Sequence, residues 1–152
     1  LGGQNAPLMS PRTYCKLIQP RHRRLFSSIK QQAPVKVFYH TCGAVRKLIP
    51  DLIDARIDIL NPIQISSPGM DPQELKREYG RDLVFWGGGV DTQRVLGVAS
   101  LEEIRVHVRR NIEALAPGGG FVFAAVHDIQ ANVPPENIMA MYEAWQEYGL
   151  YS

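Results

Sequence analysis

Residues 38–64 read FYHTCGAVRKLIPDLIDARIDILNPIQ and contain a complete strand–helix–strand pattern. The run from Val35 to His40 predicts a strand, residues 45–55 predict a helix, and residues 57–60 predict a second, short buried strand. A strand–helix–strand unit of this kind is typical of parallel sheets, in which the helix crosses over to the next strand with right-handed geometry. The stretch therefore indicates an α/β fold.

The same alternation continues to the end of the chain. Further strands are predicted at 83–86 and 121–126, and the helices between and around them at 10–32, 71–80, 100–115 and 134–148. The strands are short and almost continuously apolar, as expected when both faces of a parallel sheet are covered. A helix followed by four β/α units fits either a small doubly wound domain or half of an eight-stranded β/α barrel, which needs about 250 residues.

Composition limits the classes of function. The chain has 152 residues, of which 45% are hydrophobic, so a single domain with a core is expected. A net charge of +2 does not support binding to nucleic acid or to an anionic membrane, and no apolar run approaches the roughly 20 residues of a membrane span. Two cysteines and no recognisable signal peptide favour a cytoplasmic protein. Because the first residue is Leu1, we expect a piece of a longer protein.

The residues that can carry chemistry follow the predicted strands. Both candidate architectures place their sites at the carboxyl ends of the strands. There the sequence has His40 and Cys42, then Gln64, then the glycine run 87–89 with Asp91, and finally His127. This clustering is the most informative feature of the sequence.

His40 and Cys42 form a candidate metal site. On an extended strand, residues two apart point to the same side, and imidazole and thiolate are good ligands of zinc. A catalytic zinc needs three protein ligands and an open position, so His127 is the best third candidate and Asp91 is the reserve. The alternative is structural: a histidine that hydrogen-bonds to the backbone at a strand end, beside a small buried cysteine.

The other candidates have equally simple alternatives. Asp91 is either a general acid or a carboxylate that caps a turn. The glycine run 87–89 could allow a phosphate to approach the backbone, whereas the run 118–120 is interpreted as a helix-to-strand turn. His22 and His107 lie on basic helices and are expected at the surface.

Three stretches together resemble the C-terminal half of the uroporphyrinogen decarboxylase superfamily: residues 38–64, LVFWGGGVDTQRVL at 83–96 and GGGFVFAAVHDIQANVPPENI at 118–138. The opening LGGQNAPLMSPRTY is similar to the segment after the fourth barrel strand of that superfamily. The resemblance implies that residues 1–152 form a partial domain, strands five to eight of a (β/α)8 TIM barrel, with the N-terminal half absent. The superfamily contains heme-pathway decarboxylases and zinc-dependent methyltransferases that move methyl groups between corrinoids and thiols or other acceptors.

The motifs divide between these two branches. His40-x-Cys42 is similar to the zinc motif of the methyltransferases, which usually have a further Cys where this chain has His127. A histidine at that point, before the helix start at 135–137, is similar to the decarboxylases. The Gly-Asn-Leu-Asp signature of the decarboxylases is present only as Gly88-Gly89-Val90-Asp91.

The resemblance implies three hypotheses. In the first, zinc bound by His40, Cys42 and His127 activates an acceptor for methyl transfer. The methyl group is exchanged with a corrinoid such as methylcobalamin, which is free or carried by a protein. The residues that bind or orient the substrate are Gln64, Gly88, Gly89 and Asp91. In the second, Asp91 and His127 polarise uroporphyrinogen or shuttle protons in a decarboxylation that needs neither metal nor cofactor. In the third, the chain is a non-catalytic half-barrel that binds a partner or forms a homo-oligomer through its open strand edges.

Overall fold

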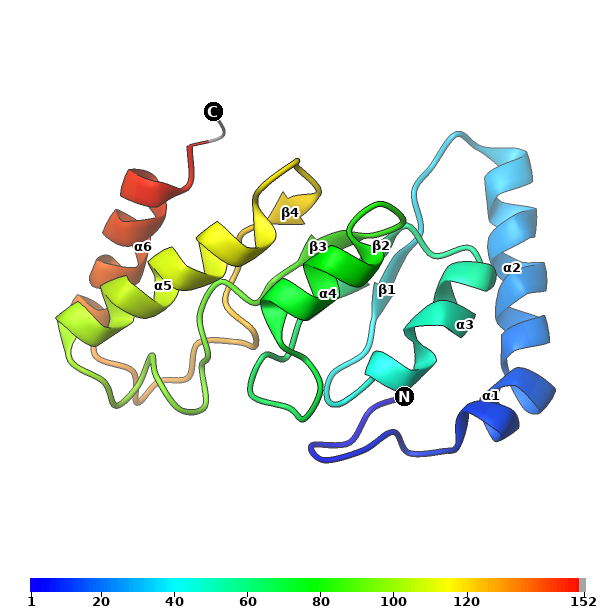
Figure 1. The fold of residues 1–152 in the computed structure, drawn as a ribbon, viewed down its shortest axis with the longest axis horizontal. Coiled ribbons are helices and arrows are strands. Elements are labelled where there is room, and N and C mark those ends of the chain that lie inside the picture. The colour runs from blue at the N-terminus through cyan, green and yellow to red at the C-terminus, as the bar shows by residue number, and fades with distance from the viewer. Residues whose placement is uncertain (151–152) are drawn as a thin grey trace.

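A computed structural model describes residues 1–150 and shows an α/β fold built on one parallel sheet (Figure 1). The strands are β1 (Phe38–His40), β2 (Ile59–Asn61), β3 (Val84–Trp86) and β4 (Phe121–Val122), and their order in the sheet is the order in the chain. All three neighbouring pairs are parallel, with Leu60 opposite both Tyr39 and Phe85. This arrangement confirms the predicted fold class.

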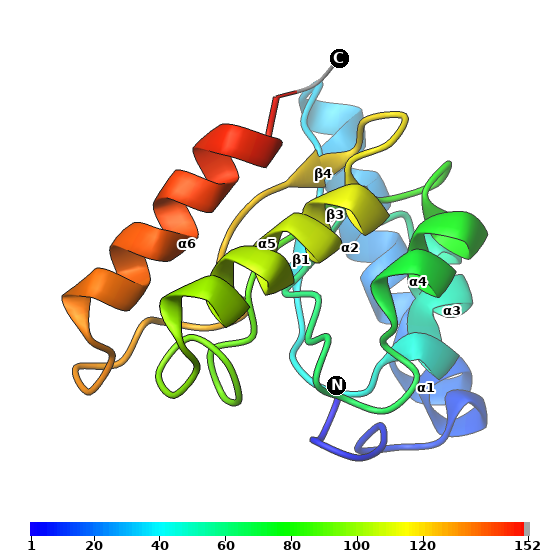
Figure 2. The ribbon, with the colours of Figure 1, turned by 60° about the vertical axis from the view of Figure 1, so that its left-hand side comes forward.

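Helices follow the strands in the predicted alternation and succeed one another in chain order across the molecule (Figures 1 and 2). Their bounds are α1 (Pro11–Leu17), α2 (Gln19–Gln32), the short 3₁₀ helix η1 (Arg46–Leu48), α3 (Ile49–Asp54), α4 (Pro72–Tyr79), α5 (Leu101–Leu115) and α6 (Pro135–Tyr148). None of the helices within residues 1–150 has the length and apolar character needed to cross a membrane.

The two faces of the sheet differ in exposure. Leu60 and Phe85 point toward the helices and are fully buried. On the opposite face, Phe38 remains 46% exposed and Trp86 37% exposed, with their rings in edge-to-face contact at 5.2 Å. Because successive side chains of a strand alternate between faces, this pattern identifies one covered and one open face. A parallel sheet in chain order with helices on one side is the arrangement found in part of a β/α barrel.

Two predicted elements differ from the structure because of proline. The helix predicted over residues 10–32 is two helices, α1 and α2, which meet at Ile18. Pro20 lacks an N–H, and inside a continuous helix its ring would clash with the carbonyl four residues earlier, so a new helix begins there. The helix predicted over 45–55 begins instead as η1 and becomes α3 around Pro50.

The first and last strands are shorter than predicted. Residues 35–37 do not join the ladder, although the carbonyl of Val37 accepts hydrogen bonds from Asp58 and Ile59. Beyond β4 the chain stays beside β3, because the N–H of Gly89 donates to Ala124 and the N–H of Val126 donates to Val90. The segment after β4 therefore continues over the carboxyl ends of the other strands.

The helices α4 and α5 start at the capping residues that the sequence predicts. The Asp71 carboxylate accepts the N–H of Glu74 at the start of α4, and Ser100 and Glu103 form a reciprocal capping box at the start of α5. Gly118, Gly119 and Gly120 all have positive φ, which confirms the helix-to-strand turn predicted for that run.

Candidate metal centre at the carboxyl ends of the strands

His40 and Cys42 lie at the end of β1 and point toward each other. The Cys42 Sγ is 3.4 Å from the His40 Nε2, as expected for two residues spaced by two on an extended chain. The same sulfur is 3.9 Å from the Nδ1 of His127, although 85 residues separate them. A thiol therefore lies between two imidazole nitrogens at the carboxyl edge of the sheet.

The path of the chain after β4 explains how His127 reaches this position. β1 and β4 are the two outer strands of the sheet. The segment from Phe123 to Val126 continues parallel to the residues after β3, where Ala125 bridges to Val90. His127 is thereby carried over the carboxyl ends of the strands toward β1.

Asn61 fixes the orientation of His40. The two residues are opposite each other in the β1–β2 register, and the Asn61 Oδ1 is 2.7 Å from the His40 Nδ1. The Asn61 amide nitrogen donates to the carbonyl of Trp86 at 3.1 Å, so its oxygen is left to accept from His40. This network assigns the proton of His40 to Nδ1 and leaves the lone pair of Nε2 directed at Cys42.

The donor set and spacing suit a zinc ion. With ordinary Zn–S and Zn–N bonds, two tetrahedral ligand atoms lie about 3.5 Å apart, close to the 3.4 and 3.9 Å measured from the Cys42 sulfur. A histidine whose other nitrogen donates to an amide oxygen is the usual arrangement of a zinc ligand. Within residues 1–150, no group of three or more His, Cys, Asp or Glu side chains is placed so that it could hold a metal ion.

A hollow of about 530 Å³ opens beside the cluster. His40 and Asn61 form one side of it, and residues 124–130 form the other. Two of the lining residues are alanines, Ala124 and Ala125, so the space next to His127 is not filled by large side chains. The hollow is large enough for a small molecule to approach His40 and His127, which both line it.

Gln64 supports the loop that carries Cys42. Its Oε1 accepts the N–H of Gly43 at 2.7 Å, and its Nε2 donates to Gln4 at 2.7 Å. The side chain is 3% exposed. Both polar atoms of this predicted substrate-binding residue are thus engaged within the protein.

Asp91 lies apart from the two histidines and the cysteine. Its Oδ1 accepts the N–H groups of Gln93 and Arg94 at 2.8 and 3.2 Å, as in a turn or helix cap. The residue is 4% exposed and lines a different hollow from the one that His127 lines. The structure therefore brings together His40, Cys42 and His127, and it does not bring Asp91 to them.

Gly88 and Gly89 allow close packing of protein. Gly88 has φ +87°, and a Cβ there would approach Ile63 to 3.0 Å. A Cβ on Gly89 would lie 2.4 Å from the ring of Phe123. The space beside these two predicted substrate-binding glycines is occupied by side chains of the chain itself.

The sequence predictions for two histidines were wrong. His22 was expected at the surface, but it lies among Tyr14, Phe26 and Tyr39, and its Nδ1 is 3.0 Å from the Tyr14 hydroxyl. His107 was expected in solvent, but its Nε2 accepts the backbone N–H of Asp91 at 3.3 Å. Burial lowers the pKa of both rings.

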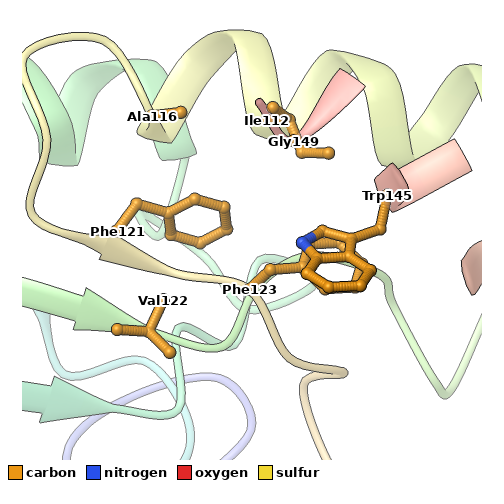
Figure 3. Close-up of a pocket in the computed structure, with 7 residues that line it drawn as sticks. All are labelled: Ile112, Ala116, Phe121, Val122, Phe123, Trp145 and Gly149. Atoms are coloured by element: carbon orange, nitrogen blue, oxygen red, sulfur yellow. The ribbon is translucent and has the colours of Figure 1, made fainter. Parts of the chain in front are cut away.

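A second, apolar hollow of about 400 Å³ lies between α5, β4 and α6 (Figure 3). Phe123 and Trp145 stack beside it, with ring centroids 5.9 Å apart and an angle of 23° between the rings. Its lining residues are Ile112, Ala116, Phe121, Val122, Phe123, Trp145 and Gly149. None of them is nucleophilic or titratable at neutral pH.

The fold and the cluster together define a β/α-barrel protein with its polar site at the carboxyl ends of the strands. A family model described as uroporphyrinogen decarboxylase (URO-D) matches residues 3–148. The chain belongs to this family.

Among solved structures, the fold is similar to that of a methyltransferase from Methanosarcina mazei, with a TM-score of 0.71 and 23% sequence identity. The match covers 94% of this chain and 39% of that protein, so this chain spans well under half the length of the methyltransferase. No curated protein matches the sequence.

Proposed function

We propose that this chain is the zinc-binding part of a methyltransferase of the URO-D superfamily, acting between a corrinoid and a thiol or similar acceptor. The observation that supports the proposal most strongly is the placement of the Cys42 sulfur 3.4 Å from the His40 Nε2 and 3.9 Å from the His127 Nδ1. A neutral imidazole with a free nitrogen and a cysteine sulfur are zinc donors, and a third ligand from another strand end leaves one position open.

The chemistry supplied by the metal is simple to state. A zinc ion at this cluster would act as a Lewis acid that lowers the pKa of an acceptor thiol at the open position. His40, Cys42 and His127 would hold the ion. The hollow beside Ala124 and Ala125 would admit the acceptor.

Three other residues take positioning roles in the proposal. Asn61 holds the His40 ring so that its unprotonated Nε2 faces Cys42. Gln64 fixes the loop through the N–H of Gly43, the residue next to Cys42. Asp91 shapes the loop that follows β3 through the N–H groups of Gln93 and Arg94. In the proposal the contacts of Asn61 and Gln64 keep His40 and Cys42 aligned.

The decarboxylase alternative has less support from the geometry. It requires Asp91 and His127 to act on one substrate. Asp91 is buried, its Oδ1 is engaged by two N–H groups, and it lines a hollow separate from that of His127.

A methyl-transfer assay tests the proposal. Because half of a barrel is expected to be inactive alone, the protein is expressed from its complete reading frame, loaded with zinc and incubated with methylcobalamin and a small thiol. Demethylation of the corrinoid is followed by its absorbance. We expect a rate above that of the protein-free mixture in the parent and in Cys15→Ser, which changes the other cysteine of the chain. Cys42→Ser is expected to remove the enhancement. Equal rates in the two serine variants would contradict the proposal.

A further inference from the structure

A polar hollow of about 350 Å³ lies outside the metal cluster. It is enclosed by residues 65–72, which lead into the first turn of α4, by the loop after β3, and by one side of α5. None of the residues of the His40–Cys42–His127 cluster lines it. Its side chains include a serine and two arginines that the proposed methyl transfer does not use.

Ser67 has a buried hydroxyl that lacks a partner. The residue is 4% exposed, and its Oγ makes no hydrogen bond among residues 1–150. Its backbone is fixed, because its N–H donates to Gln64 and its carbonyl accepts from Met70. A buried polar group without a partner is costly to the free protein, so a hydroxyl in this state at the wall of a polar hollow indicates a ligand that completes it.

Arg94 and Arg110 supply positive charge at the same hollow. Neither forms an ion pair with a carboxylate within the described residues 1–150. By contrast, two neighbouring arginines of α5 are paired: Arg105 with Glu143 and Arg109 with Glu113. The planar guanidinium group donates two parallel hydrogen bonds that match the oxygens of a phosphate. Without a carboxylate partner in residues 1–150, the donors of Arg94 and Arg110 are free to bind one.

The two carboxylates of the hollow are already compensated by backbone groups. Asp71 accepts the N–H of Glu74 at the positive end of the α4 dipole. Asp91 accepts two N–H groups in its own loop. His107 accepts the N–H of Asp91 through Nε2, which leaves Nδ1 as the protonated nitrogen and so as a further donor.

We infer that this hollow binds the phosphate group of a small ligand, with Arg94 and Arg110 pairing with its oxygens and the Ser67 hydroxyl donating to one of them. A volume of about 350 Å³ exceeds that of a phosphate ion, so the hollow also accommodates the organic part of a phosphomonoester. The site is independent of the metal cluster and of the proposed methyl transfer.

Calorimetric titration of the full chain at constant ionic strength tests the inference, with inorganic phosphate and glycerol phosphate as probes and chloride as the reference anion. We expect one saturable site per chain. Arg94→Gln and Arg110→Gln are expected to weaken binding by at least about tenfold, as for loss of a charged hydrogen bond. Arg109→Gln removes the same charge from the next position of α5, outside the hollow, and is expected to stay within about twofold of the parent.

Ser67→Ala gives a second test, in which the melting temperature of the free protein and its increase on phosphate binding are expected to change in opposite directions. Without phosphate, its melting temperature is expected to rise, because the unpartnered hydroxyl is removed. With phosphate, the ligand-induced increase in melting temperature is expected to be smaller than in the parent. Tighter binding of glycerol phosphate than of inorganic phosphate would identify an ester as the occupant, and equal binding would identify the free anion.

Three results would overturn the inference. One is the absence of saturable binding to the parent chain. Another is equal weakening by Arg110→Gln and Arg109→Gln, which would mean that only the overall charge matters. The third is a Ser67→Ala variant whose phosphate-induced shift matches that of the parent.

Discussion

At the scale of single residues, the site depends on one hydrogen-bond chain across three strands. The carbonyl of Trp86 accepts from Asn61, Asn61 accepts from His40, and His40 faces Cys42. The spacing of His40 and Cys42 predicts their side-by-side placement from sequence. Asn61 could not be predicted, because its contact with His40 depends on the register of β1 against β2. The packing of Gly89 against Phe123 depends equally on the parallel course of the chain after β4.

Asn61→Ala tests this orienting contact. Without the acceptor, the His40 ring is free to change its tautomer and rotate, so zinc affinity is expected to fall by about 10- to 100-fold. Affinity is measured by competition with a chromophoric chelator, and circular dichroism checks that the fold persists. The matched control is Gln130→Ala, which changes another amide at the rim of the same hollow. Unchanged zinc affinity in Asn61→Ala would refute the orienting role.

For the helices and strands, local sequence signals predict where a helix starts better than they predict how long a strand is. The caps at Asp71 and Ser100 depend only on residues within one helical turn, so they are visible in the sequence. The extents of β1 and β4 depend on which backbone groups find a partner on the neighbouring strand, which no local pattern contains. The break at Ile18 follows from Pro20, whereas the amphipathic pattern alone predicts one helix through residues 10–32.

Ser100→Ala tests the capping box of α5. The Ser100 hydroxyl accepts the N–H of Glu103, and the Glu103 carboxylate accepts the N–H of Ser100 at 2.8 Å. Loss of the hydroxyl is expected to lower the free energy of unfolding by about 1 kcal/mol. Urea denaturation measures this change, with Ser28→Ala in an exposed part of α2 as the control. Equal effects of the two substitutions would show that the cap contributes nothing specific.

His22 makes the packing of α2 sensitive to acid. Tyr14, Phe26 and Tyr39 surround the ring, and burial followed by the charge of the N-terminal ammonium lowers its pKa below the usual 6.5. The unfolded chain therefore binds more protons than the folded chain as the pH falls through 6.5, and stability decreases in that direction.

His22→Gln removes this titration and keeps an acceptor for the Tyr14 hydroxyl. Between pH 7 and pH 5, the free energy of unfolding is expected to fall less in the variant than in the parent. The difference between the two slopes against pH is expected to correspond to the uptake of less than one proton. Urea denaturation at a series of pH values measures it. A variant whose stability falls with the same slope as the parent would show that His22 does not contribute.

At the scale of the whole molecule, the outstanding feature is the open face of the sheet. Phe38 and Trp86 stand on it next to His40 and Asn61, while the opposite face is covered by helices. The alternating strand and helix pattern predicts the parallel sheet. It does not predict that the segment after β4 reaches the end of β1, where His127 lies 3.9 Å from the Cys42 sulfur.

An open apolar face is expected to promote self-association of the isolated chain. The double variant Phe38→Ser, Trp86→Ser removes two aromatic side chains, each worth roughly 2 kcal/mol when buried, so association is expected to weaken by well over about tenfold. Sedimentation velocity over a range of concentrations measures it. Leu25→Ser, which changes an exposed apolar residue of α2, is the control. A parent chain that sediments as a monomer at every concentration would contradict this expectation.

The proposed function depends on a zinc ion held by Cys42, His40 and His127. Elemental analysis of the purified chain after equilibration with zinc and removal of free metal tests it most directly. We expect one zinc per chain in the parent and in Cys15→Ser, and none in Cys42→Ser. A parent without zinc, or a Cys42→Ser variant that retains it, would contradict the claim.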